Sequence, residues 1–202
     1  LWKRYWVKMT LMKKLSTYLF LFLFSFSVPS FAEDISEFQI EGMSLGDSLL
    51  DYFSEEEIIN NVQDYYSYID DKFSVTEFNN SKLFNNYDGL KITFKTYDND
   101  FVIHGLSGGI FFDNNIEGCY KKRDEISNEV STLFKNVSKE GPDFTKHPAD
   151  QSNKSTASGV SFFLKNGNVV LIDCIDWSEE MRPYMDNLSV NYRTKEFNDW
   201  LY

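Results

Sequence analysis

Few residues of this sequence could do chemistry, and the first candidate is a serine set between glycines. The G-x-S-x-G pattern of serine hydrolases is matched by Gly105-Leu106-Ser107-Gly108-Gly109. In those enzymes the pattern places the serine on a sharp turn between a strand and a helix. The base would have to be His104 or His147, the only two histidines of the chain. Because Ile110-Phe111-Phe112 favours further strand, the sequence supports two interpretations: a small secreted serine hydrolase, or a strand bent by glycine.

A second candidate is a run of oxygen-bearing side chains that could bind calcium. The segment Asp113-Asn114-Asn115-Ile116-Glu117-Gly118 is similar to the first half of a calcium-binding loop, with a glycine at its sharp turn. The ligands would be Asp113, Asn115, Glu117 and, at the twelfth position, Asp124. The alternative is a polar turn whose acids favour the start of the following helix. We expect no metal and no other cofactor, and keep a calcium-stabilised structure as an alternative.

The two cysteines, Cys119 and Cys174, are the only ones in the chain. In an oxidising compartment we expect them to form a disulfide, since exported proteins keep such bonds. Closing a loop of this length stabilises the folded state by roughly 4 kcal/mol in the chain-entropy model. Two buried free thiols are the alternative.

An export signal is expected within residues 1–32, together with a short N-terminal extension. Lys13 and Lys14 precede an apolar run from Leu15 to Val28, and Ser30 and Ala32 supply small residues for signal peptidase. The run has about 14 residues, fewer than the roughly 20 that span a bilayer. We therefore expect cleavage before Glu33, no stable membrane insertion afterwards, and a single domain over residues 33–202 in the periplasm or outside the cell.

The charge of the chain limits its partners. The net charge is −11, and residues 1–32 hold five basic and no acidic residues, which leaves −16 for residues 33–202. Binding to nucleic acid needs clustered Lys and Arg, so we expect no nucleic-acid partner. An aromatic content of 17% favours a folded domain over a disordered chain.

The domain is expected to begin with helices. Ser44 is predicted to cap a short helix, and Ser54 with Glu57 matches the capping box that opens a second one. The second helix is predicted to reach Tyr65 and to bury Ile58, Ile59 and Val62. Strands are then expected over 73–78, 90–97 and 101–112. The first half of the middle strand, Leu90–Lys95, alternates apolar and polar residues, which is typical of a sheet with one wet face.

The second half of the domain contains the longest predicted helix, over 118–137. Its apolar face is predicted to comprise Ile126, Val130, Leu133, Phe134 and Val137, and its outer face to include Lys121, Lys122, Arg123, Asp124 and Glu129. Residues 138–158 are predicted to form a long polar loop, either disordered or a lid. A hairpin of 160–165 and 168–176 is expected around Asn166-Gly167 in a type I′ turn. A last strand over 188–193 and a terminal helix capped by Thr194 complete an α+β domain with a mostly antiparallel sheet.

One stretch of the sequence carries a resemblance. Residues Phe38 to Ile58, which read FQIEGMSLGDSLLDYFSEEEI, resemble the opening of uncharacterised secreted proteins of AT-rich marine alphaproteobacteria. That resemblance implies export. Within it, Gly42-Met43-Ser44-Leu45-Gly46 is similar to the start of small two-helix-plus-meander domains in inhibitor-like and outer-membrane assembly proteins. This second similarity implies binding to other proteins.

These patterns favour a non-catalytic binding module that contacts an envelope or extracellular protein, or a small ligand, across its sheet. The chain offers no nucleophile, base and orienting group at credible spacing. Tyr65, Tyr66 and Tyr68 could form a stacking surface for sugar rings or a peptide, or a half-buried helix face. An enzyme predicts a pocket where Ser107 meets a histidine and an acid, whereas a binding module predicts a flat or grooved sheet face with exposed Tyr and Phe side chains.

Overall fold

The computed structural model describes residues 38–66, 69–79, 84–134 and 136–202. Residues Ser36–Tyr202 form one compact unit. The predicted signal segment, its cleavage site and Tyr68 lie outside the described residues.

The described part of the chain is built around one antiparallel sheet. Its eight strands are β1 (Val62–Gln63), β2 (Phe73–Phe78), β3 (Gly89–Lys95), β4 (Ile103–Phe111), β5 (Ser138–Lys146), β6 (Thr156–Phe163), β7 (Val169–Asp176) and β8 (Asn187–Arg193). They lie in the order β1-β2-β3-β4-β8-β7-β6-β5. Every neighbouring pair is antiparallel, which confirms the predicted α+β class and mostly antiparallel sheet.

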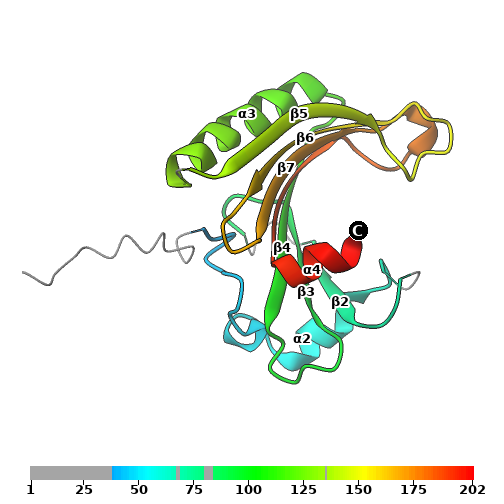
Figure 1. The fold of residues 1–202 in the computed structure, drawn as a ribbon. Coiled ribbons are helices and arrows are strands. Elements are labelled where there is room, and N and C mark those ends of the chain that lie inside the picture. Colours follow the sequence, from blue (N-terminus) through cyan, green and yellow to red (C-terminus); the bar gives the residue numbers. More distant parts are fainter. Residues whose placement is uncertain (1–37, 67–68, 80–83, 135) are drawn as a thin grey trace, which may run out of the picture. The chain divides into compact units, whose positions relative to one another are not determined.

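The helices lie on both sides of this sheet. They are α2 (Glu55–Asn60), α3 (Ile116–Leu133) and α4 (Lys195–Leu201), with two short 3₁₀ helices, η2 (Leu49–Asp51) and η3 (Glu179–Met181). The sheet is strongly curved, with α3 against its convex side and α4 on its concave side (Figure 1). The concave side is therefore only partly covered.

A large part of the hydrophobic core lies on the convex side. Alternate residues of the central strands point there, including Ile92, Leu106, Ile172, Leu188, Val190 and Tyr192, all of them almost fully buried. The segment before α2 covers part of this face with Ile40, Met43 and Leu49. Phe38 packs edge-on against Tyr192, with ring centroids 5.1 Å apart. The concave side has an apolar cluster of its own under α4, where Phe73, Val75 and Phe197 are buried, and it carries polar residues elsewhere.

The N-terminal helices differ in part from their prediction. The capping box is confirmed, because Ser54 accepts from the Glu57 amide and Glu57 accepts from the Ser54 amide. The predicted cap Ser44 is wrong: its amide donates to Asp47, and Ser48 caps η2 instead. Helix α2 ends at Asn60, because Val62 pairs with Thr76 of β2 and continues as strand. Ile59 and Val62 are consequently exposed, and Ile58 alone of the three predicted residues is buried.

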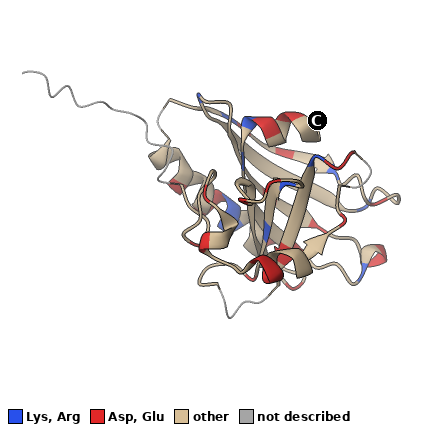
Figure 2. Ribbon diagram, turned by 90° about the horizontal axis from the view of Figure 1, so that it is seen from below, with Lys and Arg blue, Asp and Glu red and all other residues tan. Residues whose placement is uncertain are grey.

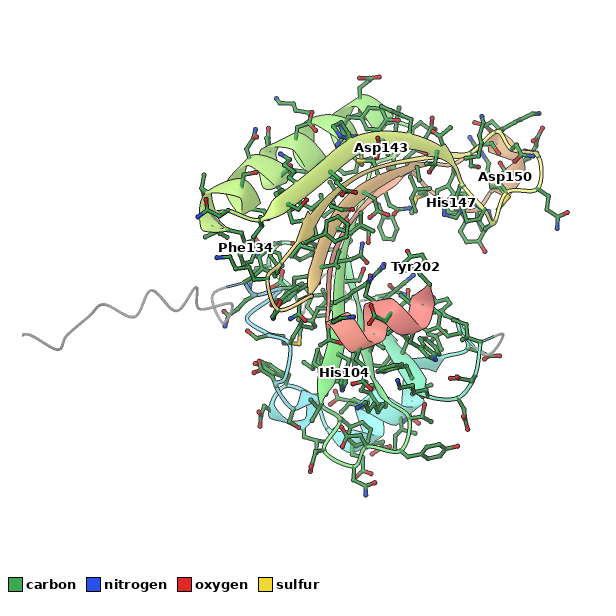
Figure 3. All side chains as sticks on the ribbon, viewed as in Figure 1. His104, Phe134, Asp143, His147, Asp150 and Tyr202 are labelled. Atoms are coloured by element: carbon green, nitrogen blue, oxygen red, sulfur yellow. A yellow bond between two sulfur atoms is a disulfide. The ribbon has the colours of Figure 1, made fainter. Side chains whose placement is uncertain are left out.

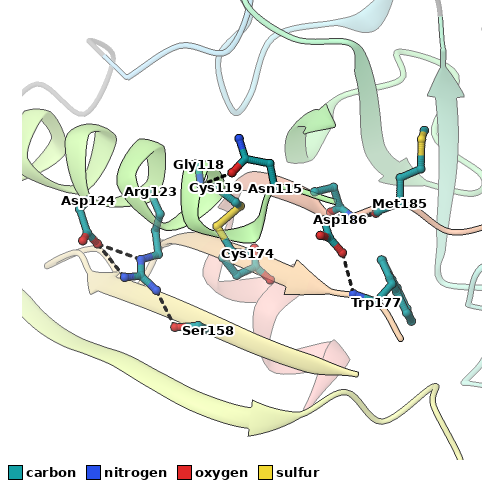
Figure 4. The surroundings of a disulfide bond; sticks show 12 residues. Asn115, Gly118, Cys119, Arg123, Asp124, Ser158, Cys174, Trp177, Met185 and Asp186 are labelled. Atoms are coloured by element: carbon teal, nitrogen blue, oxygen red, sulfur yellow. Dashed lines mark hydrogen bonds and ion pairs between the residues drawn. A yellow bond between two sulfur atoms is a disulfide. The ribbon is translucent and has the colours of Figure 1, made fainter. Parts of the chain in front are cut away.

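Helix α3 presents only part of the predicted face to the sheet. Val130 is buried as predicted, but the other buried residues are Cys119, Arg123 and Ser127, and Leu133 is 52% exposed. The Cys119–Cys174 disulfide fixes this orientation by joining α3 to β7, with the two Cα atoms 6.0 Å apart (Figure 4). Arg123 was expected on the outer face but is buried. Its guanidinium donates to the Asp124 carboxylate and to the Ser158 hydroxyl, which satisfies a group that is costly to bury unpaired.

Residues 138–158 do not form a long polar loop. They contain strand β5 and the start of β6, joined by residues 147–155. All nine residues of β5 are exposed, and its sequence SKEGPDFTK does not alternate apolar and polar residues. The pattern that predicts a strand is therefore missing. The connecting segment is held by Asp150, which accepts hydrogen bonds from the Ser152 and Ser155 amides and the Ser155 and Ser178 hydroxyls.

The hairpin between β6 and β7 has a different turn from the predicted type I′. A type I′ turn needs positive φ at both central residues, but φ is positive at Gly167 and not at Asn166. The Gly167 amide donates to the Leu164 carbonyl at 2.9 Å. The connection is therefore a three-residue loop that ends on a left-handed glycine, another common hairpin form.

Candidate functional site

Ser107 lies in the middle of a strand and not on a nucleophile elbow. Its strand, β4, is paired on both sides, and Ser107 lies opposite Lys91 of β3 and Asn191 of β8. The chain continues as strand to Phe111 before α3 begins at Ile116. Its hydroxyl lies 3.0 Å from the Ser189 hydroxyl. The glycines of the G-x-S-x-G pattern are therefore paired residues of a strand, and they do not form a turn that exposes a nucleophile.

The two histidines lie in different parts of the domain. His104 is beside α4, whereas His147 is next to Asp150 at the far end of β5 (Figure 3). The His104 ring packs edge-on against Phe73 at 5.3 Å, and burial lowers its pKa, as does the nearby Lys95 to a smaller extent. The His147 ring packs against Trp177 at 4.4 Å, and burial lowers its pKa too. Within the described residues, the Ser107 hydrogen bond goes to Ser189 and to neither histidine, so no Ser–His pair forms.

The calcium candidates have structural partners of their own. Asn115 caps α3, where its Oδ1 accepts from the Gly118 amide at 3.1 Å. Glu117 follows in the first turn of the helix. Asp124 accepts two hydrogen bonds from Arg123, one from Nε at 2.9 Å and one from Nη2 at 2.8 Å. Asp113 is an exposed residue before the helix. In the part of the chain that the structure describes, no group of three or more potential metal ligands comes together.

One hollow in the described part of the chain is a cleft on the concave face of the sheet, with a volume of about 410 Å³. Strands β2, β3, β4 and β8 form its floor, and the segment between β7 and β8 forms one wall. Its lining residues are Tyr65, Glu77, Asn79, Gly89, Leu90, Lys91, Ser107, Gly109, Phe111, Ile175, Trp177, Pro183, Tyr184, Met185, Asn187 and Ser189. The volume is in the range of small-molecule sites, about 300–1,000 Å³.

Aromatic side chains form the walls of this cleft. Trp177 and Tyr184 stack on one another, with ring centroids 5.0 Å apart and an interplanar angle of 27°. The Trp177 amide donates to the Asp186 carboxylate at 2.9 Å (Figure 4), and the Trp177 ring rests on His147. Tyr184 is nevertheless 61% exposed. The stacked pair is thus held in place from behind while one aromatic ring remains open to solvent.

The opposite wall contains the charged residues of the cleft. Glu77 and Lys91 form an ion pair at 3.9 Å, and the Lys91 ammonium lies 4.5 Å from the centroid of the Tyr65 ring. The Tyr65 hydroxyl donates to the Glu77 carboxylate. Burial, followed by this hydrogen bond, raises the pKa of Tyr65 above its usual value. Both charges of the lining are therefore engaged by each other and by Tyr65.

A row of polar side chains runs from the cleft floor across the central strands. Ser107 bonds to Ser189, and the Asn191 amide donates to Ser189 Oγ at 3.0 Å and to Asp173 Oδ1 at 3.1 Å. Desolvation raises the pKa of Asp173 to about 6, although Arg193 and Asn191 act in the opposite direction. Polar groups in the middle of a sheet are costly unless they are paired. This row is therefore a specific feature of the concave face.

The sequence identified only part of this site. Tyr65 and Ser107 were singled out for stacking and for catalysis, but the link between β4 and the segment around Tyr184 depends on β8 pairing with β4 across 82 positions of sequence. One local signal could have shown the polar row. Asp173 interrupts the apolar run Val169–Ile175, and Ser189 and Asn191 alternate with the apolar residues of β8.

The basic residues of the domain are consecutive at Lys121, Lys122 and Arg123 of α3. Elsewhere among the described residues, Lys and Arg are interspersed with Asp and Glu (Figure 2). Among the same residues, no helix is both long enough and apolar enough to cross a membrane.

Comparison with known proteins found no relative of this chain. No protein-family model, no curated protein and no solved structure matched this chain. The assignment of function therefore depends on the geometry of the cleft.

Proposed function

We propose that this chain is a non-catalytic binding module that holds a small molecule in the cleft on the concave face of its sheet. The observation that carries the proposal is the combination of exposed aromatic walls with a floor of hydroxyl groups in one hollow of about 410 Å³. Small-molecule sites combine apolar and aromatic linings with a few placed polar groups in the same way.

The arrangement of the candidate catalytic residues supports binding over catalysis. A hydrolase needs a nucleophile in hydrogen-bond contact with a base, and among the described residues Ser107 contacts another serine. Its strand is paired on both sides, so its backbone amides are engaged in the sheet and are not free to stabilise an oxyanion.

We also propose that the module is exported and works in the periplasm or outside the cell. The support is the Cys119–Cys174 disulfide, because such bonds persist in oxidising compartments, together with the signal-like segment in residues 1–32.

The experiment uses a glycine that opens into the cleft. A Cβ added at Gly109 would meet only the Gly89 carbonyl oxygen, at 3.9 Å, so the backbone accepts a side chain there. We expect Gly109→Leu to fill the cleft, while Gly109→Ala leaves most of its volume open.

The assay is ligand-observed NMR with a fragment library of sugars, aromatic acids, amines and aliphatic alcohols. We expect at least one fragment class to bind the parent protein and Gly109→Ala, and to be lost with Gly109→Leu. Thermal melting confirms that both variants are folded. If all binding fragments were equally retained by folded Gly109→Leu, the cleft would not be the site.

A further inference from the structure

We infer that the ligand of the cleft is a neutral saccharide, whose ring stacks on Tyr184 and whose hydroxyl groups bond to Ser107 and Ser189. The inference rests on the proposed binding function and names the chemical class of its ligand. Three features of the cleft support it: a rigid aromatic surface, a hydroxyl and amide floor, and the absence of an unpaired charge among its described lining residues.

The aromatic surface suits a ring with an apolar face. Tyr184 is 61% exposed although it is stacked on Trp177, and Phe111 and Met185 beside it are 47% and 44% exposed. Clustered exposed apolar side chains are typical of interaction sites. A sugar ring presents a face of C–H groups that can cover an aromatic ring, while its hydroxyl groups point outward along the rim of the ring.

The floor offers neutral hydrogen-bonding groups at the positions that such hydroxyl groups would reach. Ser107 and Ser189 lie 3.0 Å apart, and each hydroxyl can both donate and accept. Asn79 and Asn187 add amide oxygens to the lining, while their Nδ2 groups donate to the Glu77 carboxylate and to the Met185 carbonyl. A purely apolar ligand, such as a lipid chain, would remove these groups from water without replacing their hydrogen bonds, which costs free energy.

The charges of the cleft disfavour an anionic ligand. Glu77 and Lys91 are paired, so the cleft lining has no spare cation for a phosphate or carboxylate group. The net charge of −11 for the chain adds a repulsive field toward anions. An uncharged polyhydroxylated ring meets neither obstacle.

A glycine of the floor leaves room for a ring. Gly109 of β4 lies opposite Gly89 of β3, and both line the cleft. A Cβ at Gly109 would meet only the Gly89 carbonyl oxygen, at 3.9 Å, whereas one at Gly89 would meet the Asn79 side chain at 2.7 Å. The open part of the floor is therefore at Gly109, on the same strand as Ser107.

The test is isothermal titration calorimetry of the full purified protein with neutral sugars, namely glucose, galactose, N-acetylglucosamine, maltose and cellobiose. Glucuronate and glucose 6-phosphate are the charged counterparts. We expect at least one neutral sugar to bind and the charged forms to bind more weakly. Tyr184→Ala should weaken binding about tenfold through the loss of stacking, and Gly109→Leu should abolish it. The control Tyr97→Ala removes an 80% exposed tyrosine outside the cleft and should leave binding unchanged.

The outcomes separate this inference from the proposed function. If no neutral sugar binds, or if the charged sugars bind more tightly, the saccharide assignment is wrong. If another fragment class binds and is blocked by Gly109→Leu, the saccharide assignment again fails while the binding function stands. A second arm uses the same sugars as the ends of immobilised glycans. If the immobilised glycans retain the parent protein but not Gly109→Leu, the saccharide assignment is supported and the ligand is the end of a glycan polymer. If the protein binds only the free sugars, the assignment is supported and the ligand is a soluble sugar.

Discussion

Replacing Asp173 by Asn should stabilise the domain at neutral pH. Desolvation on the concave face raises the pKa of Asp173 from 3.8 to about 6, so the folded state favours the protonated carboxyl. Between about pH 4 and pH 6 the folded protein therefore binds more protons than the unfolded chain, and stability falls as the pH rises through this window. Above pH 6 this difference in pKa lowers the free energy of unfolding by about 3 kcal/mol. Asn has nearly the same shape as a protonated Asp and can still accept from the Asn191 amide.

The assay is urea unfolding of the parent protein and Asp173→Asn at pH 4, 5, 6 and 7.5. We expect the two proteins to be nearly equal at pH 4, and the variant to gain stability progressively up to about 3 kcal/mol at pH 7.5. Asp143→Asn is the matched control, because Asp143 lies on the exposed strand β5, and this variant should have the stability of the parent. A variant less stable than the parent at pH 7.5 would refute the reasoning, since it would mean that the ionised carboxylate stabilises the concave face.

Three further predictions concern stability and are measured by the same unfolding assay. Ser54→Ala should lower the free energy of unfolding by about 1 kcal/mol because it removes the capping box. Ser44→Ala should have little effect because the Ser44 hydroxyl caps no helix. Equal losses in the two variants would contradict the assignment of the caps. Gly108→Ala should destabilise by about 1–3 kcal/mol, because its Cβ would lie 2.5 Å from the Tyr87 ring, while Gly109→Ala should be nearly neutral; the reverse order would mean that the two glycines face opposite sides from those described. Replacing Cys119 and Cys174 together by Ser should lower the free energy of unfolding by about 4 kcal/mol, because the bond closes a loop of 55 positions. A urea midpoint equal to that of the parent under non-reducing conditions would show that the disulfide does not restrict the unfolded chain.

The local signals in the sequence predicted the parts of the fold that depend on neighbouring residues. The capping box at Ser54 needs only two side chains three positions apart, and the strand over Phe73–Phe78 carries its own β-branched and aromatic residues. Where the outcome depends on distant partners, the prediction failed. Val62 continues as strand because Thr76 is available to pair with it, and Arg123 is buried because Ser158 and Asp124 satisfy its guanidinium.

The candidate site was harder to predict for the same reason. The serine motif has local spacing that matches an enzyme, but its strand is paired on both sides, which no local pattern reveals. The cleft combines Tyr65, Ser107 and Tyr184 from segments far apart in the sequence. Their proximity follows from the strand order, in which β8 returns to pair with β4 after the whole β5–β7 meander.

The outermost strand, β5, has a consequence for how this domain behaves beside other molecules of its kind. An unpaired strand edge is a template onto which a second chain can add, and such addition leads to aggregation. In β5 the pairing register shifts between Glu140 and Asp143, Pro142 lacks an amide donor, and Lys139 and Lys146 place charge along the border. The opposite edge, β1, is only two residues long. Both borders are thus poor templates for intermolecular pairing, which protects a domain whose sheet is only partly covered on its concave side.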